Sequence, residues 1–460
     1  MDRTSERLVN FTASFSAESM SGSALNRAVD LLFDTAACAV AGTASEPASM
    51  VARLARSVQS NPSATVFGYG LKTSPELAAL ANTMMVRTYD YNDAYYGHPS
   101  DMIPGVLAAG EIARSSGMQV LSCIGVAYEI YAAFARSAPY HLDSWLDQGV
   151  FMNVAVALAV GKLWNLKESQ LANAASLALV PNLPLGVSRW GRLSMMKGCS
   201  TAFSVRNGVF AAMLAKEGFT SASEPYEGIF GLHSAIGPFE LCLPVDPGGM
   251  RVVEMAYVKP IPAENNTIGL LELAPVIREW TSVSEIEAID IELATGLDVH
   301  LADDSKYDPK TRESADHSLP YMLARALVDG EITLDSYSQA RISDVTIRGL
   351  MRKIAVRGSE ELKALMRASR GPEAKPARIR VTANGREFVR EILGHSGHPQ
   401  TPENVRREML NRKLDLCSHY AGVSTEQRER IRQAWWGIPA AQNVNEAIDT
   451  LSILRPSPFE

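Results

Sequence analysis

Cysteine is sparse in this sequence, and no two cysteines are close together. The chain has five cysteines, and none of them forms a CxxC pair. Zinc sites and iron–sulfur clusters use closely spaced thiolates, so this spacing disfavours both kinds of centre. Scattered cysteines are typical of proteins from a reducing compartment. We therefore expect no metal site.

The sequence also lacks the segments with which proteins commonly bind nucleic acids, membranes or nucleotides. It has no run of five Lys or Arg residues and a net charge of −7, which argues against a nucleic-acid surface. Its longest apolar runs, such as VFMNVAVALAVG, are shorter than the roughly 20 residues of a membrane span. It has no GxGxxG or GxxxxGK(S/T) loop, so we expect no nucleotide cofactor. The charged N-terminus does not resemble a signal peptide, and we expect a cytoplasmic protein.

What is present is the composition of a folded protein with more than one core. A chain of 460 residues with 46% hydrophobic residues favours two domains. From about residue 5 to 260, apolar residues recur at steps of three and four, which predicts closely packed helices. Ser74-Pro75 is typical of a helix start within this part.

The pattern changes after Pro262. Alternating β-branched residues appear there, and Asn384-Gly385 predicts a hairpin. Charged amphipathic helices return after residue 397. We therefore predict a mainly α fold, in which a large all-helical domain is built from both chain ends and carries an inserted, smaller α+β lid domain. The predicted ranges are 1–265 and 398–460 for the helical domain and 266–397 for the lid.

One polar segment interrupts the apolar helical part. Residues 90–101 read DYNDAYYGHPSD and lie between two Ala-rich apolar runs. One interpretation is a helix cap, with Ser100 or Asp101 at the helix start and Pro104 in its first turn. A cap does not explain Asp90 and His98, because titratable groups beside apolar helices are costly unless they are used.

This segment resembles the D-(F/Y)-(N/D)-D…HPSD signature of the MmgE/PrpD family. Four further segments resemble that family in the expected order, and they cover nearly the whole chain. They are MMKGCSTAFSVRNG, KPIPAENNT, KYDPKTRESADHSLPYMLARALVDG and VTANGREF followed by GHSGHPQTPENV. The resemblance implies the fold described above, a homodimer, and an active site in the cleft between the two domains. The family contains 2-methylcitrate dehydratases, cis-aconitate decarboxylases and iminodisuccinate epimerases.

Enzymes of this family act on small polycarboxylates, which require cations to hold carboxylates, a base and an acid. Lys197 and Lys259 match the two active-site lysines of the family. Arg189 and Arg192 lie just upstream of Lys197 and are candidate carboxylate clamps. Outside this context, a solvated charge on a helix surface is the more common interpretation of each lysine, and it is about as common as a substrate clamp for the arginines.

The remaining candidates supply acid–base groups and contacts to the substrate. Asp90 and His98 match the first Asp and the His of the signature, and they are the candidate base and acid. Tyr321 matches the family's SLPY tyrosine, whose hydroxyl is able to donate to a leaving group. We predict that catalysis uses Asp90, His98, Lys197 and Tyr321. The predicted substrate-binding residues are Asn92, Asp93, Ser100, Arg189, Arg192, Lys259 and Glu264.

The chain departs from the family at positions that bear on the reaction. Gln148 stands where the decarboxylases and dehydratases have a histidine, and Glu264 stands where the decarboxylases have a second one. The missing histidines favour a dehydratase acting on a citrate-like polycarboxylate such as 2-methylcitrate or a longer 2-alkylcitrate. A decarboxylase, an epimerase of a related carboxylate, and a non-catalytic polycarboxylate-binding protein remain as alternatives.

Overall fold

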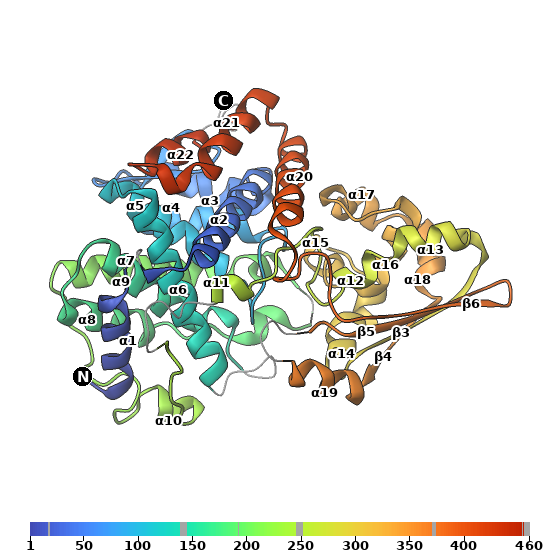
Figure 1. The fold of residues 1–460 in the computed structure, drawn as a ribbon, viewed down its shortest axis with the longest axis horizontal. Helices are drawn as coiled ribbons and strands as arrows, with labels where there is room; N and C mark the ends of the chain where they lie inside the picture. The colour runs from blue at the N-terminus through green and yellow to red at the C-terminus, as the bar shows by residue number, and fades with distance from the viewer. Residues whose placement is uncertain are drawn as a thin grey trace.

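The fold is mainly α, as predicted, with one small mixed sheet (Figure 1). The structure is a computed structural model of the chain. The structure describes residues 1–16, 19–138, 145–191, 193–244, 252–369, 374–452 and 454.

Two hydrophobic clusters form the core. The first contains residues from 8 to 258, Leu334 and residues from 410 to 454, and we call this part the larger lobe. The second contains residues from 263 to 388, and we call it the smaller lobe. Figure 1 shows the two lobes side by side, with the sheet in the smaller one. The domain boundaries at 265 and 397 and the function of the smaller lobe as a lid remain predictions.

The larger lobe has a hydrophobic cluster that contains residues of helices from early and late parts of the sequence. Its helices are α1 (Arg3–Ser14), α2 (Gly22–Gly42), α3 (Glu46–Arg56), α4 (Pro75–Arg87), α5 (Ile103–Ala113), α6 (Gly117–Ser137), α7 (Met152–Leu163), α8 (Glu168–Leu179), α9 (Ser200–Lys216), α10 (Leu232–Ile236), α11 (Val252–Met255), α20 (Glu403–Ala421), α21 (Thr425–Trp436) and α22 (Asn445–Thr450), with the short strands β1 (Ala64–Val66) and β2 (Leu71–Thr73). Helix α20 packs along α2, so residues far apart in the sequence share one interface.

The smaller lobe surrounds a four-stranded sheet in the order β4-β3-β5-β6. Strands β3 and β4 are parallel, whereas β5 is antiparallel to both β3 and β6. Figure 1 shows α13 and α16 above the strands and α14 and α19 below them. The elements are α12 (Ile268–Leu271), α13 (Ala274–Trp280), β3 (Ile286–Ala294), α14 (Leu297–Ala302), α15 (Arg312–Ala315), α16 (Leu319–Asp329), α17 (Gln339–Ile342), α18 (Arg348–Met351), β4 (Ile354–Ser359), α19 (Glu360–Ala368), β5 (Ala377–Ala383) and β6 (Arg386–Ile392).

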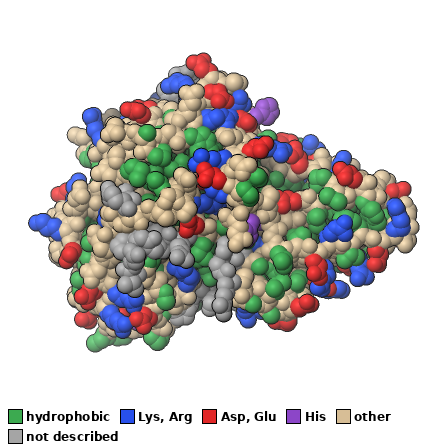
Figure 2. Space-filling view, in the orientation of Figure 1, with side chains coloured by type: hydrophobic (Ala, Val, Ile, Leu, Met, Phe, Trp, Pro, Cys, Tyr) green, Lys and Arg blue, Asp and Glu red, His purple; other side chains and the backbone are tan. Residues whose placement is uncertain are grey.

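Helix α6 is long and apolar enough to cross a membrane by length and composition alone. In the structure, 89% of its most apolar stretch is buried against neighbouring helices. A helix that is apolar on all sides is expected at such a position in a protein core. Figure 2 shows charged side chains of both signs distributed over the visible face of both lobes.

Candidate active site

Asp90 is the centre of a buried charged cluster. Its Oδ1 accepts from Arg87 Nη1 at 2.6 Å and from Lys259 Nζ at 2.9 Å. Its Oδ2 lies 3.3 Å from Lys197 Nζ. Burial alone would raise the pKa of Asp90, but these three cations hold it well below its ordinary value. The carboxylate is therefore charged, and it holds three cations together.

The backbone at Asp90 explains how these groups meet. Helix α4 ends at Arg87, and Asp90 follows with a φ of 50°, in the left-handed region that Asp tolerates better than most residues. Lys259 Nζ also donates to the carbonyl oxygen of Asp90 at 2.7 Å. The sharp turn thus presents both the carboxylate and the carbonyl of one residue to Lys259.

Lys197 connects the two lobes. It lies in the short helix η5 (Met195–Gly198) of the larger lobe, and its Nζ is 2.8 Å from Asp316 Oδ1 in the smaller lobe. Burial would raise the pKa of Asp316, but Lys197 and neighbouring groups lower it to about 2. Arg312 Nη1 lies 3.3 Å from the other oxygen of Asp316. The cluster therefore extends from Asp90 across the junction of the lobes.

His98 is fixed in one tautomer. Its Nδ1 lies 2.6 Å from the carbonyl oxygen of Asp93, and because a carbonyl only accepts, Nδ1 carries the proton. Its Nε2 lies 3.3 Å from Asp90 Oδ1. Burial, together with Arg87 and Lys259, lowers the pKa of His98 well below its ordinary value. The ring is therefore neutral near pH 7, with a lone pair on Nε2 that is able to take a proton.

A second histidine, His317, faces the same cluster from the smaller lobe. Its Nδ1 donates to Asp316 Oδ1 at 2.9 Å and lies 3.7 Å from Asp90 Oδ2. Its ring meets that of His300 edge to face at 5.6 Å, and His300 lies 5.8 Å from the ring of Trp190 in the larger lobe. Burial and the nearby Lys197 lower the pKa of His317. The rings of Trp190, His300 and His317, which come from both lobes, thus contact one another beside the charged cluster.

The structure brings together Asp90, His98, Lys197 and Lys259, which come from three separate segments of the sequence. Sequence analysis missed Arg87, Asp316 and His317. The signals for them were weak. Arg87 stands three residues before Asp90, and Asp316-His317 directly precede the SLPY segment.

Three residues predicted to bind substrate hold the loop together. Asp93 Oδ1 accepts from the Ser100 backbone and hydroxyl at 3.0 and 2.6 Å, and its Oδ2 accepts from Tyr128 at 2.8 Å. Asn92 Nδ2 donates to Ser100 Oγ at 2.7 Å and to Asp101 Oδ1 at 2.8 Å. Asn92, Asp93 and Ser100 are fully buried and bonded to each other, so they support the loop, and their direct contact with a substrate remains a prediction.

The structure contradicts the interpretation of Ser100 or Asp101 as a helix cap. The chain forms the short helix η2 (Pro99–Met102) and then α5, with Pro104 in the first turn of α5 as expected. Neither helix is capped by a side-chain hydrogen bond. Ser100 bonds to Asp93 and Asn92 instead, so its hydroxyl is not available to the backbone amides of α5.

Arg189 holds a carboxylate, but it is one of the protein's own. Its Nε donates to Asp147 Oδ2 at 2.8 Å, and its other nitrogens donate to the Lys197 carbonyl at 3.2 Å and to Ser200 Oγ at 3.1 Å. These contacts support the segment that carries Lys197, and the role of Arg189 as a substrate clamp remains a prediction. Arg192 lies outside the described residues.

The side chains of Tyr321 and Glu264 both form hydrogen bonds within the protein. The Tyr321 hydroxyl donates to the Ser336 carbonyl at 2.6 Å inside the hydrophobic cluster of the smaller lobe. The ring packs among apolar side chains of this lobe, and a catalytic role for Tyr321 remains a prediction. The Glu264 carboxylate accepts from the backbone and side chain of Asn266 at 2.8 and 2.7 Å, and its charge acts on Lys259 nearby.

Asp90, Asp316 and His317 offer ligand atoms within 4.8 Å of one another, a spacing that metal ions use. Lys197 Nζ lies 2.8 and 3.3 Å from oxygens of the two carboxylates. A metal ion bound there would have to displace this ammonium or accept its repulsion. The donor set is therefore better matched to a lysine cation than to a metal, and the absence of a metal remains a prediction.

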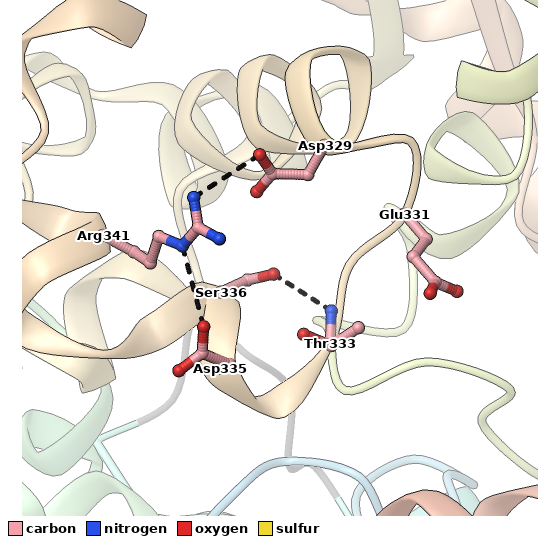
Figure 3. A pocket seen from close by; sticks show the side chains of 6 residues that line it. All are labelled: Asp329, Glu331, Thr333, Asp335, Ser336 and Arg341. Atoms are coloured by element: carbon pink, nitrogen blue, oxygen red, sulfur yellow. Dashed lines mark hydrogen bonds and ion pairs between the residues drawn. The ribbon is translucent and has the colours of Figure 1, made fainter.

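A separate cavity of about 270 Å³ lies in the smaller lobe (Figure 3). Arg341 reaches across it toward Asp329 and Asp335, at 3.7 and 3.6 Å. It is lined by Asp329, Glu331, Thr333, Asp335, Ser336 and Arg341. None of the predicted site residues lines this cavity, so it is distinct from the Asp90 cluster.

Comparison with known families gives two matches that together cover most of the chain. The MmgE/PrpD N-terminal domain matches residues 6–238, and the MmgE/PrpD C-terminal domain matches residues 262–437.

Named proteins with similar sequences include both decarboxylases and dehydratases. The cis-aconitate decarboxylase of Aspergillus terreus is 22% identical, over 99% of this chain and 97% of its own length. The 2-methylcitrate dehydratase of Escherichia coli strain K12 is 27% identical, over 79% of each chain. The cis-aconitate decarboxylase of Mus musculus is 22% identical, over 72% of this chain and 70% of its own. These identities are too similar to choose between the two reactions.

Proposed function

Because this chain belongs to the MmgE/PrpD family, we propose that it is a cofactor-independent lyase that eliminates water from a citrate-like polycarboxylate. The substrate would be 2-methylcitrate or a longer 2-alkylcitrate. Relatives named 2-methylcitrate dehydratase support this class of substrate.

One observation carries the proposal: a neutral histidine and three cations converge on one buried carboxylate. His98 Nε2, Arg87, Lys197 and Lys259 all approach Asp90. Burial of several charges is costly unless they are paired, and three cations that share the Asp90 carboxylate are able to hold an anionic ligand. The uncharged imidazole beside them is able to act as the base that removes a proton next to a carboxylate.

The lysines retain donors for a substrate. Each ammonium has three N–H groups. Lys197 uses two of them on Asp90 and Asp316, and Lys259 uses two on the carbonyl and carboxylate of Asp90. In the proposed reaction, Lys197 and Arg87 hold substrate carboxylates, since both lie beside Asp90.

The elimination then needs one proton acceptor and one proton donor. His98 Nε2 takes the proton from the carbon next to a carboxylate, the carbon–carbon double bond forms, and the carbon–hydroxyl bond breaks. The leaving hydroxide takes a proton from Lys259 and departs as water. Burial lowers the pKa of Lys259, which makes its ammonium a better acid. Transfer of the proton from His98 back to Lys259, directly or through water, restores the enzyme.

Access to these groups requires movement at the junction of the lobes. Lys197 and Lys259 are almost fully buried, and Lys197 is bonded to Asp316 across the junction. We propose that the lobes separate to admit the substrate, whose carboxylate then replaces Asp316 as a partner of Lys197. Such closure around a ligand also removes water from the reacting groups.

The test incubates the purified protein with a panel of citrate, 2-methylcitrate, longer 2-alkylcitrates and cis-aconitate. Absorbance measures formation of the conjugated alkene. We expect alkene formation with loss of water. Release of CO2 from cis-aconitate would instead assign a decarboxylase. Deuterium uptake without loss of water would assign an epimerase, and calorimetric binding without turnover would assign a non-catalytic binding protein.

The proposal also includes a cytoplasmic homodimer, which rests on family resemblance and composition. Light scattering of the purified protein tests the dimer. A monomer at micromolar concentration would contradict it.

A further inference from the structure

A lysine from the C-terminal part of the chain lies directly behind the candidate site. Lys413 is on α20, and its side chain is 1% exposed. Its ammonium donates to the Asp34 carboxylate on α2 and to the carbonyl oxygen of Tyr91, and it lies 3.3 Å from the carbonyl oxygen of Lys259. It also lies 4.0 Å from the centre of the Tyr91 ring.

These two carbonyls belong to the backbone that carries the site. Tyr91 directly follows Asp90, and Lys259 is itself a member of the charged cluster. The two segments run antiparallel, since Ala94 and Tyr257 exchange backbone hydrogen bonds at 3.0 and 2.9 Å. Lys413 joins them at the end where Asp90 and Lys259 meet.

The contacts of Lys413 leave it no role as a substrate ligand. Its three N–H groups have three acceptors within the protein: one carboxylate and two carbonyls. Burial alone would lower the pKa of Lys413, but Asp34 raises it above its ordinary value, so all three donors persist at neutral pH.

We propose that Lys413 is a positioning residue, which sets the separation of Asp90 and Lys259 by holding the backbone of both segments from behind. The effect on catalysis rests on the proposed function, whereas the effect on geometry does not. A misplacement of about 1 Å in a catalytic group is able to cost about a hundredfold in rate.

The test uses two double variants that differ only in a hydrogen-bond donor. Asp34→Asn/Lys413→Met and Asp34→Asn/Lys413→Gln both remove the buried charge pair, so neither leaves a charge without a partner. The glutamine amide still donates to a carbonyl, but methionine does not. For the Met double variant, we expect kcat to fall about tenfold to a hundredfold below wild type, with KM nearly unchanged. For the Gln double variant, we expect kcat to stay within about tenfold of wild type.

Arg406→Met is the matched control for stability. Arg406 forms a buried ion pair between the same two helices, with Asp30 on α2, and it also donates to the Thr401 carbonyl. We expect Arg406→Met to lower the melting temperature and leave kcat unchanged. Equal kcat in the two double variants, or an equal loss of kcat in Arg406→Met, would overturn the proposal.

A crystal structure of the Met double variant separates this inference from the proposed function. We expect Lys259 Nζ to move away from Asp90 Oδ1, which lies at 2.9 Å in the native chain. If that contact is retained, Lys413 does not position the site, whatever the substrate. If the contact is lost but wild type turns over no member of the panel, the positioning role stands and the proposed reaction fails.

Discussion

Asp90 and Asp93 are two buried carboxyl groups on one loop, three residues apart, and their surroundings are opposite. Asp90 is surrounded by Arg87, Lys197 and Lys259, and its pKa lies well below the ordinary value. The Asp93 carboxyl group accepts from Ser100 and Tyr128, and burial raises its pKa to about 7.

The difference shows how one polar segment supplies both a site and its support. The left-handed turn at Asp90 directs its carboxylate to the junction of the lobes, whereas Asp93 bonds to Tyr128 on α6 in the larger lobe. The carbonyl of Asp93 also holds His98 in its tautomer. Three cations are therefore concentrated on one side of the loop, and hydrogen bonds from hydroxyl and amide groups fix the other side.

The largest expected effect is on the Asp90 side, at His98. His98→Gln keeps a polar side chain but removes the Nε2 base, so kcat should fall about 10²- to 10⁴-fold with little change in KM. In the wild type, the rate should be lost only as pH falls well below 6.5, because the pKa of His98 is lowered and the protonated ring cannot accept a proton. A rate limited by a group titrating near pH 6.5 would contradict this assignment.

The next effect is at Lys197. Lys197→Met keeps the aliphatic stem but removes a hydrogen bond to a carboxylate worth about 1.5–3 kcal/mol, so kcat/KM should fall about tenfold to a hundredfold. Asp90 retains Arg87 and Lys259, which limits the loss of stability. Lys310→Met removes an exposed lysine paired with Asp308 and serves as a control with unchanged kcat/KM. Equal kinetics in both variants would remove Lys197 from the site.

A smaller effect on activity is expected at Tyr321, whose hydroxyl donates to a backbone carbonyl inside the smaller lobe. Tyr321→Phe leaves the Ser336 carbonyl without its donor, so the free energy of unfolding should fall by about 1–3 kcal/mol. Urea denaturation measures this change, and kcat/KM should stay within about threefold of wild type. A hundredfold loss of kcat would return Tyr321 to the catalytic residues.

The smallest effect on activity is expected at Asp93, and it appears in the pH dependence of stability. Between pH 3.8 and about 7 the unfolded chain releases the Asp93 proton while the folded protein keeps it. This carboxyl therefore lowers the free energy of unfolding by about 1.4 kcal/mol for each pH unit of increase in that window. In Asp93→Asn, the free energy of unfolding measured by urea denaturation should decline less steeply with pH between these values. Identical slopes would mean that Asp93 is ionised throughout.

Local signals in the sequence predicted the elements that depend on local interactions. Ser74 precedes α4 with Pro75 in the first turn, as predicted. Asn384 and Gly385 have positive φ values of 50° and 67° and join β5 to β6. Both features are set by backbone preferences of the residues themselves, so they do not depend on the rest of the chain.

The site was predictable only in part, because side-chain direction depends on the whole fold. Motif resemblance identified Asp90 and Lys259, which meet in the structure although they are 169 residues apart. It did not show that Ser100 turns inward or that Arg189 is bonded to Asp147. It also missed Asp316, whose contact with Lys197 exists only because the lobes meet.

The packing of α20 on α2 has a consequence for how the chain is made. Asp30 pairs with Arg406 and Asp34 pairs with Lys413, which are 376 and 379 residues later in the sequence, although Asp30 also has Arg27 three residues before it. During synthesis from the N-terminus, these two acids emerge long before Arg406 and Lys413, and contacts of such long range form slowly. We expect the smaller lobe, which is complete earlier, to fold first, while the nascent N-terminal helices persist as an unfinished intermediate that depends on chaperones.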